Sequence, residues 1–344
     1  MKNIRSSFLL ILQILFLIST EVKSQPEKAE AGIQSIMQAI PVMGLSVAVV
    51  KDNKIIYAQS FGAKSRENNT PLTNDCIFRI ASISKSFSAT SIMQLAERKK
   101  LSIDQDVSEL IGFKVRNPKF PETVITLRLM MSHLSSINDS QGYFSLDAIN
   151  PEKNPNWAKS YSHFEPGKGY AYCNLNFNMI GAIIEKISGE RFDQYVIKHV
   201  LDPLGLYGGY DVDGLDKSRF ASIYEYRADS SKFILSESAY ASRAKDISNY
   251  AMGYTTPVFS PTGGMKISAT DLAKYMLMHS NYGKYKGKRI ISSKSAAQMQ
   301  TAMSAEEGYG FALETTSKII PGKTMKGHTG VAYGLFSAMF FQPE

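Results

Sequence analysis

The chain has 344 residues, a formal net charge of +8 at pH 7 and two cysteines. This length can bury one large core or two lobes that share a cleft. The basic excess includes no block of lysines or arginines and no nucleic-acid-binding motif, so nucleic acid is not an expected partner. The five histidines show neither a His-x-His nor a His-Glu-x-x-His pattern, and we therefore expect no metal site.

Residues 1–24 are typical of a secretory signal. Lys2 and Arg5 precede an apolar run at 8–18, and Val22-Lys23-Ser24 fits a cleavage site. The run is too short to span a bilayer, and an uncleaved N-terminal anchor is the alternative. We expect an exported protein, periplasmic or secreted, with no stable membrane span after signal removal.

The remaining chain alternates between strand and helix patterns. Two strands are expected at residues 44–50 and 54–61, joined by a hairpin turn. The expected helices lie at 82–96, 127–133, 174–187 and 270–279, and the expected late strands at 309–314, 325–330 and 335–341.

Strands therefore occupy both ends of the chain and helices its middle. This order predicts an α+β fold, in which one antiparallel sheet is built from both ends and an all-helical lobe is inserted. We expect one domain over residues 25–344. Its α/β lobe covers about 25–98 and 250–344, and its helical lobe about 99–249.

The helix at 82–96 carries Ser82 and Lys85 one turn apart. Positions three apart share a helix face, so the two side chains are expected to be neighbours. The helix is apolar on most sides and has no other charge, which places Lys85 in a buried surface. Burial lowers a lysine pKa from about 10.4 by up to about 3 to 5 units, which would make Lys85 a base toward the Ser82 hydroxyl.

Ser-x-x-Lys alone is a weak signal, because it recurs at Ser242 and Lys245, where Arg243 indicates a solvated face. The first copy is distinguished by two later motifs. Tyr172-Cys173-Asn174 is the only Tyr-x-Asn in the chain, and His328-Thr329-Gly330 is the only triplet of a basic residue, a hydroxyl residue and glycine.

Some of these residues also have plainer explanations. Asn174 could serve only as the cap of the helix that follows it, and Tyr172 could lie in the core with its hydroxyl satisfied. Cys76 and Cys173 could form a disulfide in an exported chain, or Cys173 could be a packing residue.

Together, Ser82-Ile83-Ser84-Lys85, Tyr172-Cys173-Asn174 and His328-Thr329-Gly330 resemble the three motifs of the penicillin-binding-protein and class C β-lactamase group of serine hydrolases. Phe164-x-Pro166-Gly167, Leu204-Gly205 and Gly263-Gly264 are similar to spacers of that family. The resemblance covers about residues 44–341. It implies an antiparallel sheet flanked by helices, an all-helical lobe, and an active site in the groove between them.

The resemblance also implies roles. Ser82 would be acylated, Lys85 and Tyr172 would move its proton, and the backbone N–H groups of Ser82 and Val331 would form an oxyanion hole. The substrate-binding residues would be Asn174, His328, Thr329, Gly330 and Val331.

The chain departs from the family pattern in two places. The β-lactamases of the group usually have lysine where His328 stands, and a histidine is mostly neutral at pH 7. This favours neutral Lys85 over a Tyr172 phenolate as the base, and favours esters or amides that lack a carboxylate. Relatives also continue through another strand and a C-terminal helix. We therefore expect that helix to be missing and the strand at 335–341 to be an exposed edge.

The sequence thus predicts a serine hydrolase that acts through an acyl-Ser82 intermediate on an ester or amide, with no cofactor. Esterase, D-amino-acid peptidase or amidase, and weak β-lactamase activity all stay open. The expected substrate is a small molecule or peptide, cell-wall fragments included. The alternative is a penicillin-binding or sensor protein with little or no turnover. The sequence indicates no oligomeric state.

Overall fold

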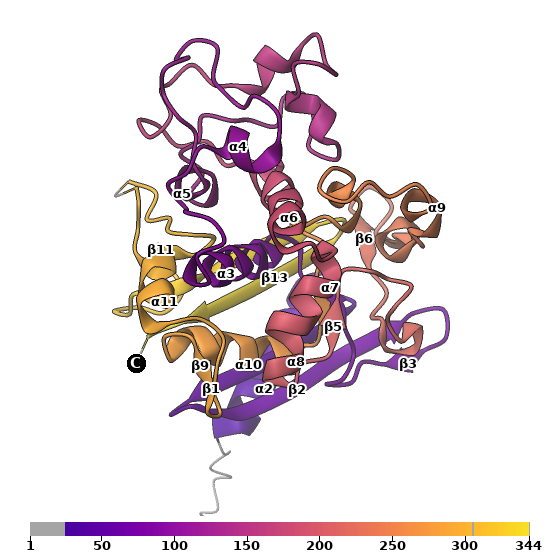
Figure 1. Ribbon diagram of the computed structural model, residues 1–344. Helices are drawn as coiled ribbons and strands as arrows, with labels where there is room; N and C mark the ends of the chain where they lie inside the picture. The colour runs from indigo at the N-terminus through magenta and orange to yellow at the C-terminus, as the bar shows by residue number, and fades with distance from the viewer. Residues whose placement is uncertain (1–24, 305, 344) are drawn as a thin grey trace, which may run out of the picture. The chain divides into compact units, whose positions relative to one another are not determined.

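The computed structural model describes residues 25–304 and 306–343, so the expected signal at residues 1–24 lies outside the described residues. Figure 1 shows the arrangement of the elements. In chain order they are α2 (Gln25–Ala39), β1 (Gly44–Lys51), β2 (Lys54–Ser65), β3 (Thr70–Pro71), β4 (Phe78–Arg79), the 3-10 turn η1 (Ala81–Ile83), α3 (Ser84–Glu97), α4 (Val107–Ile111), α5 (Leu127–Met131), α6 (Asn174–Ser188), α7 (Phe192–Val196), α8 (Asp202–Leu204), β5 (Gly208–Gly209), β6 (Tyr224–Arg227), β7 (Lys232–Leu235), α9 (Ala244–Ile247), β8 (Lys266–Ile267), α10 (Ala269–Ser280), β9 (Lys284–Tyr285), β10 (Lys288–Arg289), α11 (Ser293–Gln300), β11 (Glu314–Thr316), β12 (Met325–Ala332) and β13 (Leu335–Phe341).

The chain divides into two compact units, Met1–Val42 and Met43–Glu344. Within the first unit the structure describes α2, none of whose residues is buried. Among the described helices, none has the length and apolarity that crossing a bilayer requires.

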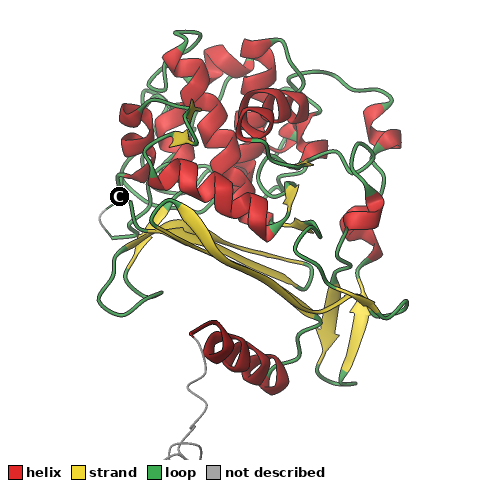
Figure 2. Ribbon diagram, turned by 90° about the horizontal axis from the view of Figure 1, so that it is seen from below, coloured by secondary structure: helices red, strands yellow, loops and turns green. Residues whose placement is uncertain are grey.

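Among the described residues, the second unit contains three antiparallel sheets of three strands, β1-β2-β3, β11-β12-β13 and the short β4-β8-β5. The predicted hairpin is confirmed, since β1 pairs with β2 from Gly44 opposite Gly62 to Lys51 opposite Lys54. The expected antiparallel strands flanked by helices are present. The strands from the two ends of the chain form separate hydrogen-bonded sheets among the described residues, because β1 and β13 each pair on one side only. Helix α10 packs against β1, β2 and β13, and Figure 2 shows the helices of this unit gathered on one side of the long strands.

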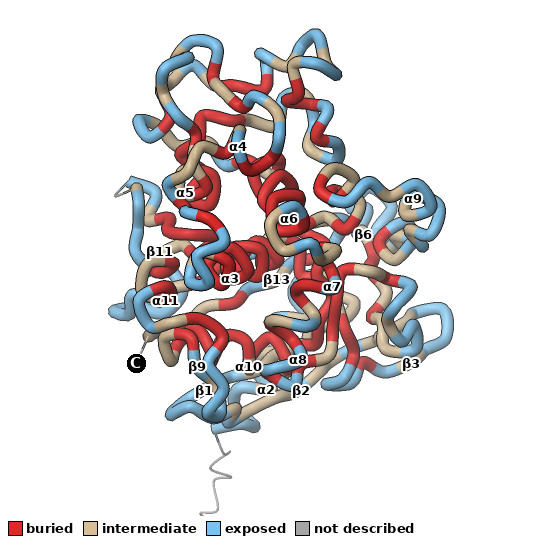
Figure 3. The backbone as a smooth tube through the Cα atoms, in the orientation of Figure 1, coloured by how far each residue is buried: buried red, intermediate tan, exposed pale blue. Residues whose placement is uncertain are grey.

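The main core lies between these strands and two long helices, α3 and α6, which pack against each other. Every residue of α3 from Ser84 to Leu95 is buried, as predicted for a helix covered on most sides. In Figure 3 most of α3 and α6 is coloured as buried. Two of the buried serines of α3 find hydrogen-bond partners locally or across the core. Ser91 donates to the carbonyl of Phe87, and Ser88 donates to the carbonyl of Pro261.

Three predicted elements differ in detail. The helix starts at Ser84 and not at Ser82, because residues 81–83 form the separate 3-10 turn. The strand expected at 309–314 is wrong. Tyr309 and Glu314 form an isolated bridge, and the strand β11 begins only at Glu314. The inserted lobe is not purely helical either, since β6 and β7 form a hairpin within it.

The strand expected at 335–341 is confirmed as β13, an edge strand among the described residues. Cys76 and Cys173 are both buried and free, so the disulfide does not form. Cys173 is instead a packing residue whose Sγ donates a hydrogen bond to Asp139.

Candidate active site

Ser82 lies on a tight turn between two regular elements. The preceding residue, Ala81, has a left-handed φ of 46°, which is strained for a residue with a side chain. The turn lies beside β12, and Gly330 of that strand is buried against it. A side chain at Gly330 would collide with the carbonyl oxygen of Ile80 and would lie 3.1 Å from the Cβ of Ala81. Glycine therefore lets the His-Thr-Gly strand approach the Ser82 turn.

Lys85 contacts Ser82 from the first turn of α3. Its Nζ lies 3.1 Å from Ser82 Oγ, 2.9 Å from Asn174 Oδ1 and 3.0 Å from the carbonyl oxygen of Thr262. The side chain is fully buried, and this desolvation lowers the pKa of Lys85 to about 7, although the negative charge of Asp139 acts in the opposite direction. A substantial fraction of Lys85 is therefore uncharged at neutral pH.

The partners of Lys85 also determine how its neutral form is oriented. A neutral amine has two N–H donors and one lone pair. The carbonyl of Thr262 and the Oδ1 of Asn174 can only accept hydrogen bonds, so they take the two N–H groups. The lone pair is then left for the hydroxyl of Ser82, which is the arrangement that a general base requires.

Tyr172 covers the same amine with its ring. Lys85 Nζ lies 4.8 Å from the centre of the Tyr172 ring. Although 40% of Tyr172 is exposed, desolvation of its hydroxyl raises its pKa well above the usual value, while a hydrogen bond with Ser82 acts to lower it. Tyr172 therefore carries its proton at neutral pH and can donate it.

Asn174 is the first residue of α6 but does not cap it. The cap position is Cys173, and no side-chain cap bond forms there. The cap-only explanation for Asn174 is therefore wrong. Its Oδ1 accepts hydrogen bonds from Lys85 and from the hydroxyl of Thr262, at 2.9 Å each.

The carboxylate of Asp139 caps α6 in place of Asn174. It accepts the backbone N–H groups of Asn174 and Leu175 and the side-chain amide of Asn174, all at 2.9 Å. Because the amide nitrogen of Asn174 faces Asp139, its oxygen must face Lys85. Sequence reasoning missed Asp139, since no spacing rule links it to a motif 35 residues later.

His328 is buried in the third motif, on β12. Its Nε2 lies 2.7 Å from the hydroxyl of Tyr309, and its Nδ1 contacts the carbonyl oxygen of Thr329. A carbonyl only accepts, so Nδ1 carries the proton and Nε2 accepts from Tyr309. Burial, followed by the charge of Lys85, lowers the pKa of His328 to about 4. The expectation of a neutral histidine is therefore confirmed at pH 7.

The remaining predicted residues lie on β12, which packs beside the Ser82 turn. Thr329 is exposed, and 63% of Val331 is exposed. The structure thus joins Ser82, Lys85 and Asn174 by direct contacts. The ring centres of Tyr172 and His328 are 6.2 Å apart.

His133 packs against the ring of Tyr172 and was not expected as part of the site. The two ring centres lie 4.2 Å apart. Its Nδ1 accepts the backbone N–H of Cys173 at 3.1 Å, and complete burial holds the pKa of His133 well below its ordinary value. Its neutral ring therefore packs against Tyr172 without adding charge.

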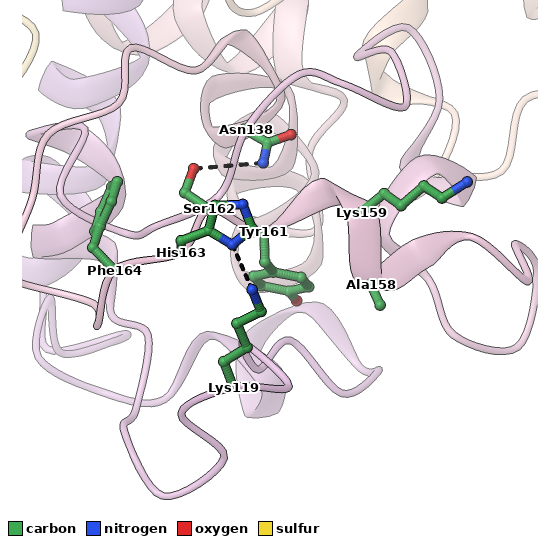
Figure 4. A pocket seen from close by; sticks show the side chains of 8 residues that line it. All are labelled: Lys119, Asn138, Ala158, Lys159, Tyr161, Ser162, His163 and Phe164. Atoms are coloured by element: carbon green, nitrogen blue, oxygen red, sulfur yellow. Dashed lines mark hydrogen bonds between the residues drawn. The ribbon is translucent and has the colours of Figure 1, made fainter.

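Two other features bear on the chemistry. Among residues 25–304 and 306–343, no group of histidine, cysteine and acidic side chains could hold a metal ion. A hollow of about 640 Å³ lies on the inserted lobe and is lined by none of the predicted site residues, as Figure 4 shows. The residues that line it are Lys119, Asn138, Ala158, Lys159, Tyr161, Ser162, His163 and Phe164.

The fold and the contact between Ser82 and the buried Lys85 define a protein of the β-lactamase/transpeptidase fold, with paired helices and antiparallel strands around the Ser82 turn. The chain belongs to the Beta-lactamase family, whose profile matches residues 30–344.

Individual relatives are more distant. The chain is 27% identical to Penicillin-binding protein 4* of Bacillus subtilis (strain 168) over 47% of its own length and 36% of that protein. It is 26% identical to Esterase EstB of Burkholderia gladioli over 55% of its own length and 52% of that protein. The chain thus spans about a third to a half of these two relatives. Among solved structures, the octameric penicillin-binding protein homologue from Pyrococcus abyssi is 26% identical, with a TM-score of 0.72 over 90% of this chain and 68% of that one.

Proposed function

We propose that this protein is a serine hydrolase that cleaves an ester or amide bond through an acyl-Ser82 intermediate. One observation carries the proposal. A fully buried lysine with a pKa of about 7 lies 3.1 Å from the hydroxyl of Ser82. Lys266 is also buried with a lowered pKa, but it donates to a backbone carbonyl; Lys85 differs because its amine contacts a hydroxyl that can act as a nucleophile.

The acylation step follows from these contacts. Neutral Lys85 takes the proton of Ser82 Oγ as the oxygen attacks the substrate carbonyl carbon, and the carbonyl oxygen becomes an oxyanion. The backbone N–H groups of Ser82 and Val331 stabilise that oxyanion. As the tetrahedral intermediate collapses, the bond to the leaving group breaks. The phenol of Tyr172 gives its proton to that group and regains one from Lys85.

Deacylation reverses this proton path. Lys85, neutral again, takes a proton from a water molecule that attacks the acyl carbon. The proton then passes to Ser82 Oγ as the ester bond breaks and the acid leaves. Asn174 holds Lys85 in place through both steps, since its amide orientation is determined by Asp139.

The substrate class has support from two sides. A relative over half of this chain is named an esterase, and another is named a penicillin-binding protein. A neutral His328 supplies no charge for a carboxylate at the position where the β-lactamases of the group usually have lysine. We therefore favour ester or amide hydrolysis over efficient β-lactam hydrolysis. Small esters, D-amino-acid peptides and cell-wall fragments are the compounds to test, and the pattern of residues 1–24 supports action outside the cytoplasm.

The test combines labelling with turnover. We expect the intact mass of the wild type to increase by one adduct after treatment with a fluorophosphonate or a penicillin, and the mass of Ser82→Ala to stay unchanged. We also expect the wild type to release p-nitrophenol from p-nitrophenyl esters over many cycles, with nitrocefin and D-alanyl peptides measured in parallel. Labelling without repeated product release would favour the penicillin-binding or sensor alternative. Labelling of Ser82→Ala would overturn the assignment of the nucleophile.

A further inference from the structure

Arg79 is a second cationic side chain close to the Ser82 turn, and the reaction above does not use it. It ends β4, three residues before Ser82, and its Nε donates to the carbonyl of Gly263 at 2.8 Å. Lys85 donates to the preceding carbonyl, that of Thr262, at 3.0 Å. The two cations are therefore held by consecutive carbonyl groups of one short loop.

The guanidinium lies near tyrosines from two other segments of the chain. Its Cζ is 5.3 Å from the ring centre of Tyr333, which lies on the turn between β12 and β13, two residues after Val331. Tyr143, in the loop that follows Asp139, is also close enough to interact with the charge of Arg79. Gly263 lies next to the guanidinium, since a Cβ built there would be 3.7 Å from Nη2. Because glycine has no side chain, this residue does not cover the guanidinium.

Arg79 has no carboxylate partner among the described residues. Arg219 is likewise half-buried without a carboxylate in an ion pair, and its Nε donates to the backbone carbonyl of Asp75. Three other half-buried arginines do pair with a carboxylate. These pairs are Arg116 with Asp106, Arg128 with Asp104, and Arg191 with Asp193. The Nη1 and Nη2 atoms of Arg79 donate to no described residue, although a guanidinium has five N–H donors in a fork that matches a carboxylate.

A half-buried cation without a carboxylate partner is costly unless a bound anion pairs with it. Other cations close by do not fill the role. Lys266 is buried and donates to the carbonyl of Tyr210, and Arg243 pairs with Asp246 at 3.6 Å. His328 is neutral at pH 7.

We propose that Arg79 is a carboxylate-binding subsite, and that the preferred ester or amide substrate carries a carboxylate which its free Nη1 and Nη2 groups bind. The proposal rests on the proposed hydrolase function for the bond that is cleaved. It also revises the expectation of a substrate without a carboxylate, since Arg79 supplies the charge that His328 does not.

The test compares matched substrates that differ by one carboxylate. One pair is p-nitrophenyl hexanoate and mono-p-nitrophenyl adipate, and the other is p-nitrophenyl acetate and 3-carboxy-4-nitrophenyl acetate. A charge-assisted bidentate contact predicts that kcat/KM favours the anionic member of one pair by about tenfold or more. The pair that responds shows whether the carboxylate belongs to the acyl group or to the leaving group. Equal rates in both pairs would overturn the proposal.

Two variants separate Arg79 from a general effect of charge. Arg79→Gln should remove the preference, whereas Arg243→Gln, which deletes a neighbouring cation that has its own partner, should leave the ratio within about twofold. If Arg79→Gln does not fold by circular dichroism, Arg79→Lys takes its place and should keep only part of the preference. Equal losses in the Arg79 and Arg243 variants would contradict a specific subsite.

A binding measurement keeps this inference separate from the hydrolase proposal. In isothermal titration, Ser82→Ala should bind adipate about tenfold more tightly than Ser82→Ala/Arg79→Gln does. If esters are not turned over but this difference appears, the hydrolase function fails and the subsite stands. If esters are turned over and Ser82→Ala binds adipate no better than the double variant, the subsite fails alone.

Discussion

The carboxylate of Asp139 accepts both the backbone N–H and the side-chain amide of Asn174, each at 2.9 Å. This double contact begins helix α6 and simultaneously turns the amide oxygen of Asn174 toward Lys85. Asp139 is therefore a positioning residue whose charge also acts on the pKa of Lys85.

Replacing Asp139 should change both the level and the pH dependence of activity. Asp139→Asn presents an amide where two backbone N–H groups need an acceptor, so Asn174 loses its orientation and we expect kcat to fall about tenfold. The negative charge of Asp139 raises the pKa of Lys85, so its removal lowers that pKa further. The acid limb of the pH–kcat/KM profile should therefore move to lower pH.

Asp106 provides the matched control for this prediction, because its side chain caps α4 by accepting from Ser108. Asparagine can still accept a cap hydrogen bond, so the stability that each variant loses comes mainly from the lost carboxylate contacts, which for Asp106 include the ion pair with Arg116. We expect a loss of roughly 1 kcal/mol or more in each. Only Asp139→Asn should move the pH profile. A shift of equal size in both variants would show that Asp139 has a structural role alone.

The pH profile of the wild type should report the titration of Lys85. Only the neutral amine can accept the Ser82 proton, and its pKa is about 7. For a neutral ester, kcat/KM should rise about tenfold per pH unit below pH 7 and level off above it. Steady-state rates between pH 5 and 9 measure this. A profile that is flat through pH 7 would argue against Lys85 as the base.

Lys266 provides a control for assigning the pH dependence to Lys85, because it does not contact Ser82. It is buried, and desolvation lowers its pKa to about 7 as well. Lys266→Met should keep the acid limb near pH 7, whereas Lys85→Met should abolish turnover of every ester. If the limb disappears in Lys266→Met, the assignment of the titrating group is wrong.

Gly330 should tolerate no side chain. In Gly330→Ala the new Cβ would meet the carbonyl oxygen of Ile80, so β12 must move away from the Ser82 turn. We expect a loss of about 1–3 kcal/mol in the free energy of unfolding and a large loss of kcat. Denaturant titration and ester hydrolysis measure the two effects. Gly209→Ala, whose Cβ would meet its neighbours at 3.7 Å, should change neither quantity appreciably.

His328 should not titrate in the working range of the enzyme. With a pKa of about 4 it stays neutral between pH 6 and 8, while Arg79 stays charged. The ratio of kcat/KM for mono-p-nitrophenyl adipate over p-nitrophenyl hexanoate should therefore be constant across this range. A ratio that climbs as the pH falls from 7 to 6 would show that a protonated His328 binds the carboxylate.

The sequence alone determined the features that depend on local geometry. Ser82 and Lys85 lie together because three residues make about one helical turn, and the apolar helix around Lys85 was enough to predict its burial. The hairpin of β1 and β2 and the strand β13 follow from alternating side chains and turn residues. The order of the three motifs identified the family.

Only the tertiary structure decided what surrounds those residues. Asn174 is bound by Asp139, and His328 by Tyr309. These pairs are 35 and 19 residues apart in the sequence, and no helix or strand periodicity predicts them. The pKa of Lys85 depends on desolvation by several elements, and the unpaired state of Arg79 depends on which carboxylates reach it. Burial and charge pairing depend on residues that are distant in sequence, so a local sequence pattern cannot predict them.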